Sequence, residues 1–510
     1  MVASSNMLLL LLLVVFCSCG GSSDTVDSQF LNVPVSQFID SIKFTIDAVE
    51  QVASIVSRFG TNFGEFRLSN AIADCIDLLD LTAEELSWTL SASSDHNSNQ
   101  GRKDNNNGTG YLSSDLRTWL TGALANQDTC IDGFDGTNSF IIKSAIAGGL
   151  NQISSLILQS LQQVHDTPPP PPPTSPSRQW NPAWFSSREL QTGWGSVDAV
   201  VATDGSGDYN KIMDAVASAP LLSTRRFVIY VKKGVYKEYV EINKHQWNIM
   251  IVGDGMDATI ISGNRSFKGG YTTFRSATFS VNGKGFIARD ITFENTAGAE
   301  MEQAVAFRSD SDLSVLYRCG IKGFQDTLYA HSSRQFYREC RISGTVDFIF
   351  GDGTVVFQSC QIVARKGKPN QKNAITAQGR KHPCNTTGFS IQFSNISVET
   401  ELLVDNQTQT YLGRPWRLYS RTMIMQSYIG PGIRAEGWLE WKGDLGLNTL
   451  WYGEYMNYGE GAGVGNRVKW PGFHLVKDPS HARNFTVAEF ILGDYWLPAT
   501  DIKYTAGLSV

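Results

Sequence analysis

The sequence lacks several signals that define common enzyme and membrane classes. It has no G-x-S-x-G motif, which disfavours a serine hydrolase built on a nucleophile elbow, and no C-x-x-C pair that would suggest a zinc site. Its one long apolar run covers residues 7–16, which is too short to span a bilayer. Small residues follow this run, although no Lys or Arg precedes it, so we expect a signal peptide at residues 1–20. A retained anchor is the minority alternative, and no other segment looks apolar enough to span.

Cysteines and glycosylation motifs favour a secreted chain. Of eight cysteines, Cys17 and Cys19 would leave with the signal peptide, and the remaining six could form disulfides in an oxidising compartment. Candidate N-glycosylation sites follow the N-x-Ser/Thr pattern. They are Asn107, Asn264, Asn385, Asn395, Asn406 and Asn484. These features predict an extracellular glycoprotein.

Six consecutive prolines divide the chain. Residues 168–173 favour a stiff polyproline II spacer, and we take residues 167–192 as the linker. Residues 1–190 carry a net formal charge of −10, whereas residues 191–510 carry +4. An acidic leader therefore precedes a mildly basic body, which suits a polyanionic substrate or partner.

The leader, residues 28–166, has helical periodicity. Apolar residues recur at helical spacing near residues 38–53, 68–79, 116–130 and 141–164. Four amphipathic helices with short connections predict an all-α four-helix bundle. Cys75 and Cys130 are the only cysteines of this region after the signal peptide, so we expect them to form a disulfide between two helices.

The body, residues 193–510, consists of short β-rich runs separated by Gly and Asn. A repeat of about 21 residues aligns Cys319 with Cys340 and Tyr329 with Phe350, and Cys360 continues it about 20 residues later. Coil-length self-similarity predicts a right-handed parallel β-helix. A β-sandwich is the alternative, but it would give hairpin signals rather than this repeat.

Two aspartates occupy equivalent places in the repeat. The run "GTVDFIFGDG" favours a strand that contains Asp347, and Asp326 lies 21 residues earlier in "GFQDTLY". A carboxylate in a buried strand must be paired or functional. Since successive coils are about 4.8 Å apart, we expect the two carboxyl groups to be neighbours. The alternative is two polar turn positions that happen to recur.

We expect two amides to lie on the same face as the two carboxyl groups, with an arginine further along the chain. Gln303 lies one coil before Asp326, Gln325 is adjacent to Asp326, and Arg414 follows in "YLGRPWRLYS". A guanidinium favours the ionised form of one carboxyl group, while two close carboxyl groups resist double ionisation. One can then serve as an acid and the other as a nucleophile or base, with amide N–H groups stabilising an oxyanion.

The ordered motifs "GVYKE", "QAVAFR", "GFQDTLY", "GTVDFIFG" and "LGRPW" resemble those of the plant pectin methylesterases from about residue 194 to residue 509. The leader resembles the pectin methylesterase inhibitor family in "ADCIDLLDLTAEEL" and "ALANQDTCIDGF". The resemblance implies a precursor that removes methyl esters from the galacturonate units of pectin, giving pectate and methanol, during cell-wall modification. It implies no metal and no cofactor.

The resemblance also implies a role for each candidate residue. Asp347 would attack the methyl-ester carbonyl. Asp326 would protonate the departing methanol and then activate water. Gln303 and Gln325 would stabilise the oxyanion, and Arg414 would orient Asp347 and keep it charged.

Substrate contacts and a second disulfide follow from the same resemblance. Thr273 and Trp416 would contact the sugar chain together with Gln303 and Arg414, and Cys340 would pair with Cys360. Cys319 and Cys384 receive no assignment. The implied partners are pectin and possibly separate inhibitor proteins, with no nucleic acid and no stable membrane insertion after signal removal.

Some conspicuous residues carry plainer interpretations, and the chain departs from its families. His331 fits a structural hydrogen bond better than a catalytic base, while Trp438 and Trp441 suit the core or the substrate groove equally. The leader lacks an early cysteine pair, and Arg188 stands alone where a dibasic processing site is usual. We therefore expect the leader to be retained and to cover the pectin groove; an aid to folding or targeting is the alternative.

Three functional classes compete at this stage. The first is the esterase, the second a non-catalytic pectin-binding or inhibitory protein acting through the leader, and the third a β-helix glycosidase or lyase. Two close carboxyl groups would suit a glycosidase, but the surrounding motifs resemble the esterases.

Overall fold

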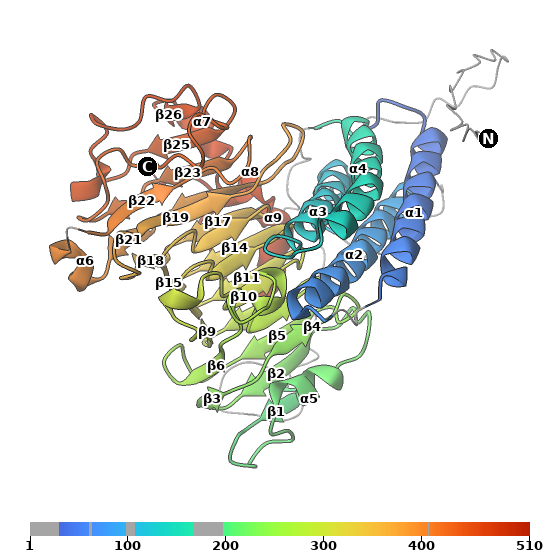
Figure 1. Cartoon of the computed structure of the whole chain (residues 1–510), viewed down its shortest axis with the longest axis horizontal. Coiled ribbons are helices and arrows are strands. Elements are labelled where there is room, and N and C mark those ends of the chain that lie inside the picture. Colours follow the sequence, from blue (N-terminus) through green and yellow to red (C-terminus); the bar gives the residue numbers. More distant parts are fainter. Residues whose placement is uncertain (1–29, 61–63, 98–107, 168–196, 406, 510) are drawn as a thin grey trace, which may run out of the picture.

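A helical bundle lies beside a long stack of parallel strands (Figure 1). This computed structural model describes residues 30–60, 64–97, 108–167, 197–405 and 407–509. The predicted signal peptide lies outside these residues, and so does the predicted linker except for Thr167.

Four helices form the bundle, as the periodicity predicted. They are α1 (Val35–Arg58), α2 (Phe66–Asn97), α3 (Leu112–Asp132) and α4 (Phe140–Gln162). Phe38, Ile42 and Leu150 are among the apolar side chains fully buried in its core. Burial of such stripes stabilises helices that would be marginal alone.

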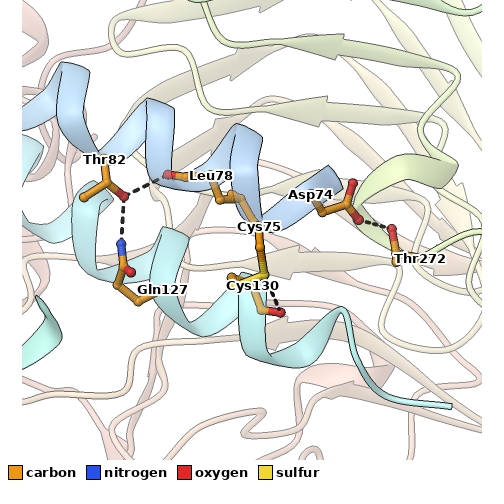
Figure 2. Close-up of a disulfide and its surroundings, with 7 residues drawn as sticks. All are labelled: Asp74, Cys75, Leu78, Thr82, Gln127, Cys130 and Thr272. Atoms are coloured by element: carbon orange, nitrogen blue, oxygen red, sulfur yellow. Dashed lines mark hydrogen bonds between the residues drawn. A yellow bond between two sulfur atoms is a disulfide. The ribbon is translucent and has the colours of Figure 1, made fainter. Parts of the chain in front are cut away.

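The predicted disulfide between Cys75 of α2 and Cys130 of α3 is present (Figure 2). One helical turn further on, Nε2 of Gln127 donates to Oγ1 of Thr82 at 2.7 Å. The covalent bond and the buried hydrogen bond fix α2 against α3. This matters because these two helices carry the bundle's contacts with the strands.

Helix α4 corrects the expectation that no segment after the signal peptide is apolar enough to span a membrane. By length and composition alone, Phe140–Gln162 passes that test, and it is the one such helix among the described residues. Ile146, Leu150, Ile153 and Ile157 of α4 are buried in the bundle core. Only the stripe of α4 that contains these residues is in the core, and the apolar side chains of Phe140 and Ile141 at the start of the helix are exposed.

The body is a parallel β-helix of three sheets. The first sheet contains β1 (Ala199–Val201), β2 (Phe227–Val231), β5 (Ile249–Val252), β8 (Ile287–Arg289), β11 (Ser314–Tyr317), β14 (Arg334–Arg338), β17 (Thr354–Gln358), β20 (Gly388–Gln392), β23 (Arg421–Met425), β25 (Trp451–Tyr455) and β26 (Phe473–Leu475). The second sheet contains β4 (Val240–Ile242), β7 (Phe279–Val281), β10 (Phe307–Ser309), β13 (Leu328–Ala330), β16 (Ile349–Gly351), β19 (Lys372–Gln378) and β22 (Gln409–Gly413). The third sheet contains β3 (Gly234–Tyr236), β6 (Thr259–Gly263), β9 (Thr292–Asn295), β12 (Gly320–Lys322), β15 (Arg341–Gly344), β18 (Gln361–Ala364), β21 (Asn395–Val398) and β24 (Tyr428–Ile429).

Short helical segments complete the body. They are α5 (Ile212–Ala217), η2 (Phe274–Ser276), η3 (Ala299–Met301), α6 (Thr400–Val404), η4 (Glu460–Ala462), α7 (Pro479–Arg483), α8 (Val487–Phe490), α9 (Gly493–Trp496) and η5 (Leu497–Thr500). The apolar cluster shared with the bundle includes a buried residue from each of η2, β13, β16 and β19: Phe274, Tyr329, Phe350 and Ala377.

The coil register agrees with the sequence repeat. Ile321 pairs with Ile342, and Tyr329 pairs with Phe350, each across neighbouring coils. Apolar residues recur at these positions because each coil packs its apolar side chains against those of the two neighbouring coils. The predicted parallel β-helix is thereby confirmed, and the β-sandwich is excluded.

Asp326 and Asp347 lie in turns, which corrects the expectation that Asp347 sits within a strand. Each lies two residues before a strand of the second sheet, β13 and β16 respectively. Their φ angles are +59° and +52°, in the left-handed region. Asp tolerates this conformation better than β-branched residues do. The neighbouring Val346 and Phe348 favoured a strand, but the chain needs a sharp corner between the third and second sheets at this point.

The structure does not contain the disulfide that the resemblance implied between Cys340 and Cys360. Both are buried and unbonded, as is Cys319 one coil earlier. Backbone hydrogen bonds from Arg341 to Cys319 (2.9 Å) and from Gln361 to Cys340 (2.8 Å) place the three cysteines in one ladder. The side chains of ladder neighbours point in the same direction, so the three buried thiols lie side by side in the structure.

A thiol titration tests this arrangement. In a chain beginning at residue 20 and denatured without reductant, we expect four reactive thiols, from Cys319, Cys340, Cys360 and Cys384. Only Cys75 and Cys130 should stay unreactive until a reductant is added. Two thiols instead of four would mean that a second disulfide forms in the body.

Candidate active site

Asp326 and Asp347 are brought together by adjacent coils. The backbone N–H of Asp326 donates to the carbonyl of Val346 at 3.0 Å, and the N–H of Leu328 donates to that of Phe348 at 2.8 Å. The two aspartates therefore occupy the same corner one coil apart. Both are nearly buried, with 8% and 5% of their surface exposed.

Arg414 holds Asp347 through both carboxylate oxygens. Its Nε and Nη2 donate to Oδ1 and Oδ2 of Asp347, each at 2.7 Å. Arg414 directly follows β22, where its backbone N–H donates to the carbonyl of Thr376 at 2.9 Å. Its guanidinium carbon lies 4.4 Å from the ring centroid of Trp441. A bidentate pair with an aromatic face behind it fixes both the position and the charge of the carboxylate.

The two carboxyl groups differ in their electrostatics. Burial and then the charge of Asp347 raise the pKa of Asp326 well above its usual range, and Arg414 offsets this only in part. Burial also raises the pKa of Asp347, but the hydrogen bonds and charge of Arg414 oppose that rise. The arrangement favours an ionised Asp347 beside a protonated Asp326.

Gln303 and Gln325 lie on neighbouring coils beside this pair. The N–H of Ala304 donates to the carbonyl of Gln325 at 3.2 Å, and the N–H of Asp326 continues the ladder to the next coil. Oε1 of Gln303 is buried and has no hydrogen-bond partner among the described residues. The structure thus brings the chain segments of both predicted amides to the corner that carries the carboxyl pair.

A row of aromatic rings runs along the second sheet next to the pair. Its members, which we call the aromatic row, are Phe274, His331, Tyr329, Phe350 and Trp416. Successive ring centroids lie 5.7, 5.0, 4.2 and 6.0 Å apart. Tyr329 and Phe350 each lie three residues after a site aspartate, so the row is in register with the carboxyl pair. Rings of this kind suit the apolar faces of sugars.

The row contains one predicted substrate contact and adjoins another. Trp416 ends it, and Thr273 immediately precedes Phe274. Sequence reasoning missed Phe274, Tyr329 and Phe350 as members of one surface, although the alignment of Tyr329 with Phe350 in the repeat was the available signal.

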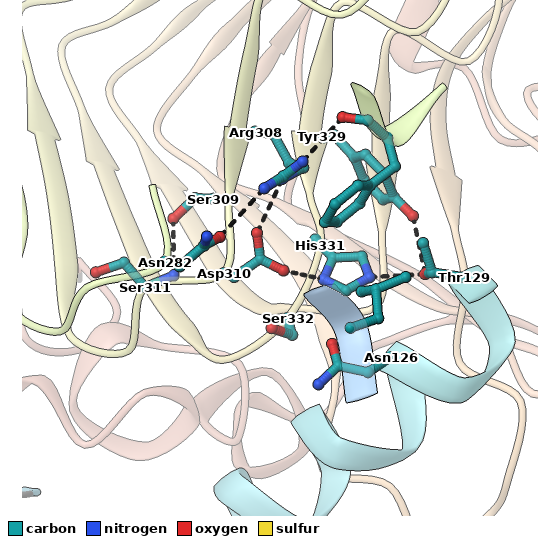
Figure 3. A network of polar contacts seen from close by, with 12 residues as sticks. Asn126, Thr129, Asn282, Arg308, Ser309, Asp310, Ser311, Tyr329, His331 and Ser332 are labelled. Carbon is teal, nitrogen blue, oxygen red and sulfur yellow. Dashed lines mark hydrogen bonds and ion pairs between the residues drawn. The ribbon is translucent and has the colours of Figure 1, made fainter. Parts of the chain in front are cut away.

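The other aromatic and histidine interpretations are now resolved. Trp438 is in the core with 1% of its surface exposed, whereas Trp441 faces Arg414. His331 is structural: Nδ1 contacts the carboxylate of Asp310, and Nε2 lies 2.7 Å from Oγ1 of Thr129 (Figure 3). The described residues contain no group of three or more His, Cys, Asp or Glu side chains that could hold a metal ion.

The bundle packs directly over the aromatic row. Buried residues of α2 and α3 form one continuous apolar cluster with Phe274, Tyr329 and Phe350. Thr129 of α3 also reaches the hydroxyl group of Tyr329 at 3.2 Å (Figure 3). Tyr329 and Phe350 are only 3% and 4% exposed in this state. The face that carries the row is therefore covered by the chain's own leader.

Ion pairs surround this apolar contact. Arg275 pairs with Asp74 at 2.6 Å and with Asp77, and Figure 2 shows Asp74 also accepting from Thr272. Buried Arg334 pairs with Asp115 of α3 at 2.7 Å. These contacts join an acidic bundle to basic side chains of the β-helix, as the charge difference between the two halves suggested.

The predicted glycosylation sites have different outcomes. Asn264, Asn395 and Asn484 are exposed, whereas Asn107 and Asn406 lie outside the described residues. Asn385 is 3% exposed, and its Nδ2 donates to Asp352 at 3.2 Å. Glycosylation at Asn385 is therefore incompatible with this fold, because the atom that would carry the glycan is buried and already bonded.

These features define a class: a parallel β-helix protein with an arginine-held aspartate pair next to an aromatic row. Two family models match the chain. The model described as Pectinesterase matches residues 198–494, and the model described as plant invertase/pectin methylesterase inhibitor matches residues 17–162.

Similar proteins agree with both matches. The chain is 60% identical to a pectinesterase/pectinesterase inhibitor of Prunus persica over 97% of this chain and 94% of that one. It is 56% identical to a probable pectinesterase/pectinesterase inhibitor of Arabidopsis thaliana over 96% and 94%. A solved pectin methylesterase from carrot is 51% identical, with a TM-score of 0.61, and covers 61% of this chain and 98% of its own. The chain therefore belongs to the pectinesterase family and is an enzyme with an inhibitor-family region at its N-terminal side.

The raised pKa of Asp326 predicts a pH-dependent penalty on folding. The pKa of an Asp in the unfolded chain is about 3.9, and in the folded chain the pKa of Asp326 is higher. Between these two pKa values the unfolded chain has lost the proton while the folded chain keeps it, so the free energy of unfolding falls as pH rises through this range. Asp326→Asn removes the penalty. We expect the variant to be more stable than the parent at pH 7 in denaturant titrations, with the difference shrinking towards about pH 4. Asp444→Asn at an exposed turn is the control, and an Asp326→Asn chain that is no more stable at pH 7 would show that Asp326 is ionised there.

Proposed function

We propose that this enzyme hydrolyses the methyl esters of galacturonate units in pectin, giving pectate and methanol. The observation that carries the proposal is the bidentate contact between Arg414 and Asp347, at 2.7 Å twice, next to a second buried carboxyl group. Family membership supplies the substrate class, because relatives are named pectinesterases and a structural neighbour is named a pectin methylesterase.

The proposed reaction divides the work between the two carboxyl groups. The carboxylate of Asp347 attacks the ester carbonyl, and the resulting oxyanion accepts hydrogen bonds from the amide groups of Gln303 and Gln325. Asp326 gives its proton to the departing methoxy group, so methanol leaves and an acyl-enzyme forms. Asp326 then takes a proton from water, which attacks the acyl-enzyme and releases galacturonate and Asp347.

Arg414 prepares Asp347 for this role without reacting. A protonated carboxyl group is a poor nucleophile. Burial raises the pKa of Asp347, and the guanidinium of Arg414 opposes that rise. Thr273 and Trp416 would contact the sugar chain beside the aromatic row. The polymer would lie along the second sheet, across the corner that carries both aspartates.

The two competing classes make different products. A glycosidase or lyase would shorten the polymer, and a purely binding or inhibitory protein would release nothing. Release of methanol without chain shortening separates the esterase from both.

The site of action follows from the substrate. We infer that the chain is secreted and acts in the cell wall, where pectin is found, with residues 1–20 as its signal peptide. The exposed sequons Asn264, Asn395 and Asn484 are compatible with passage through the secretory route. A separate inhibitor protein would compete with the leader for the same face of the β-helix.

Substitution of the carboxylate and its arginine tests the assigned roles. Asp347→Asn should remove methanol release while leaving the fold intact, because an amide cannot form the acyl-enzyme. Arg414→Lys should lower kcat by about tenfold or more, since one ammonium cannot replace a planar fork. Arg225→Lys, at an exposed ion pair with Asp198, is the matched control. Near parental rates in a folded Asp347→Asn chain would rule out Asp347 as the nucleophile.

We further propose that the leader inhibits the enzyme within the same chain. The bundle covers the aromatic row, and polymer and bundle cannot occupy this face together. The absence of a dibasic site around Arg188 favours retention of the leader. Opposite charges on the two parts orient the contact, so its strength should fall as salt increases.

Methanol release by residues 21–510 and by residues 191–510 tests inhibition by the leader. We expect the shorter chain to be faster at low salt and the difference to narrow at high salt, because screened ion pairs hold the bundle less tightly. Equal rates at low salt would exclude inhibition by the leader and leave it a role in folding or targeting.

A further inference from the structure

Four cations of the β-helix are paired only with acids of the bundle. Lys244 pairs with Asp80 at 2.8 Å. Arg275 pairs with Asp74 and Asp77, Lys381 pairs with Asp128 at 2.6 Å, and Arg417 pairs with Asp132. No carboxylate of the β-helix forms an ion pair with any of the four in the part of the chain that the structure describes. The bundle thus provides their whole complement of paired anions.

Some other arginines of the β-helix are paired with carboxylates of the β-helix itself. Arg308 pairs with Asp310 at 3.0 Å, and Arg467 pairs with Glu454 at 2.8 Å. Arg334 also contacts the bundle, but it already pairs with Asp312 of the β-helix at 2.6 Å. Departure of the bundle would therefore leave Lys244, Arg275, Lys381 and Arg417 without their carboxylate partners.

Two of these cations lie at opposite ends of the aromatic row. Arg275 directly follows Phe274, and the guanidinium carbon of Arg417 lies 4.7 Å from the ring centroid of Trp416. Lys381 belongs to the loop after β19, on the same sheet. Rings that suit sugars are thus flanked by cations that already hold carboxylates, which is a built binding surface for an acidic polysaccharide.

We propose that Arg275, Lys381 and Arg417 bind the carboxylates of de-esterified galacturonate, and that the acids of α2 and α3 occupy these places as stand-ins. The proposal rests on the proposed function for the identity of the polymer. It follows that pectate, the product, competes with the bundle for the β-helix and opens the enzyme. The neutral methyl ester cannot compete in this way, because it has no charge to offer the three cations.

The chemistry favours a run of free carboxylates over a single one. Each exposed ion pair contributes little alone, but several carboxylates on one chain bind with a raised effective concentration after the first contact. The bundle uses the same device, since its acids are all carried by two helices that the disulfide joins. Two multivalent anions therefore compete for one surface.

Hydrogen exchange in the full chain tests the competition without requiring turnover. Unesterified oligogalacturonate is added at constant ionic strength, and amide exchange is followed in α2 and α3. We expect several-fold faster exchange in the segments that face the β-helix, with a saturable dependence on concentration. A neutral maltooligosaccharide should have no effect, and polyglutamate of equal charge should have much less, because it lacks rings to stack on the aromatic row. No change with oligogalacturonate, or an equal effect of polyglutamate, would overturn the proposal.

Paired variants locate the competition. Asp128→Asn with Asp132→Asn weakens only the bundle, so the oligogalacturonate concentration for half-maximal opening should fall about tenfold. Lys381→Gln with Arg417→Gln loosens the bundle too, but it removes the ligand's partners, so opening should no longer depend on oligogalacturonate. Arg225→Gln is the control. Continued dependence in the Lys381→Gln, Arg417→Gln chain would show that these cations do not bind the ligand.

The exchange result separates this inference from the catalytic proposal. The same titration is run on Asp347→Asn, which should open as the parent does. Opening by oligogalacturonate with no methanol release from the parent would contradict the esterase proposal alone. Methanol release with no opening would contradict the present inference alone.

Discussion

The spacing of about 4.8 Å between coils of the β-helix is the constraint on which the site depends. It places Asp326 and Asp347 at the same corner of successive coils. In the strands that follow these corners, it stacks Tyr329 on Phe350. Two carboxyl groups this close cannot easily both be ionised. Arg414 decides between them because it bonds both oxygens of Asp347 and leaves Asp326 without such a partner. The coil repeat therefore sets the positions of the two carboxyl groups, and Arg414 sets which of them is charged and which keeps its proton.

The sequence predicted the architecture well because each part has its own periodicity. Helical spacing indicated the four helices, and the 21-residue repeat gave the correct coil register, including Ile321 with Ile342. The repeat also brought Asp326 near Asp347, and Arg414 was placed with them by resemblance. What failed were local details: β-formers on both sides of Asp347 hid a left-handed corner residue with φ of +52°. Cys340 and Cys360 recur at coil spacing, which makes them ladder neighbours, and the structure has them unbonded where the resemblance implied a disulfide.

The face between the two parts could not be predicted from either part alone. The charge difference indicated attraction between leader and body. It did not predict the individual contacts, such as that of Thr129 with Tyr329 or the ion pair of Asp115 with Arg334. Such contacts depend on how two folded surfaces fit, and no local pattern encodes that fit. The contact combines an apolar cluster over the aromatic row with charged pairs, some of which, such as Arg334 with Asp115, are buried. Several β-helix cations on this face have carboxylate partners only in the bundle, which makes the face suitable for an acidic polymer.

The central claim is that the coil register and Arg414 keep Asp326 protonated beside an ionised Asp347. Difference infrared spectroscopy of the folded chain at neutral pH tests it most directly, since a protonated carboxyl group and a carboxylate absorb in separate regions. The account predicts a protonated carboxyl band in the Asp444→Asn minus Asp326→Asn difference spectrum, in which Asp444 serves as an exposed reference. A difference spectrum that contains only carboxylate bands would mean that Asp326 is ionised, and it would contradict the account.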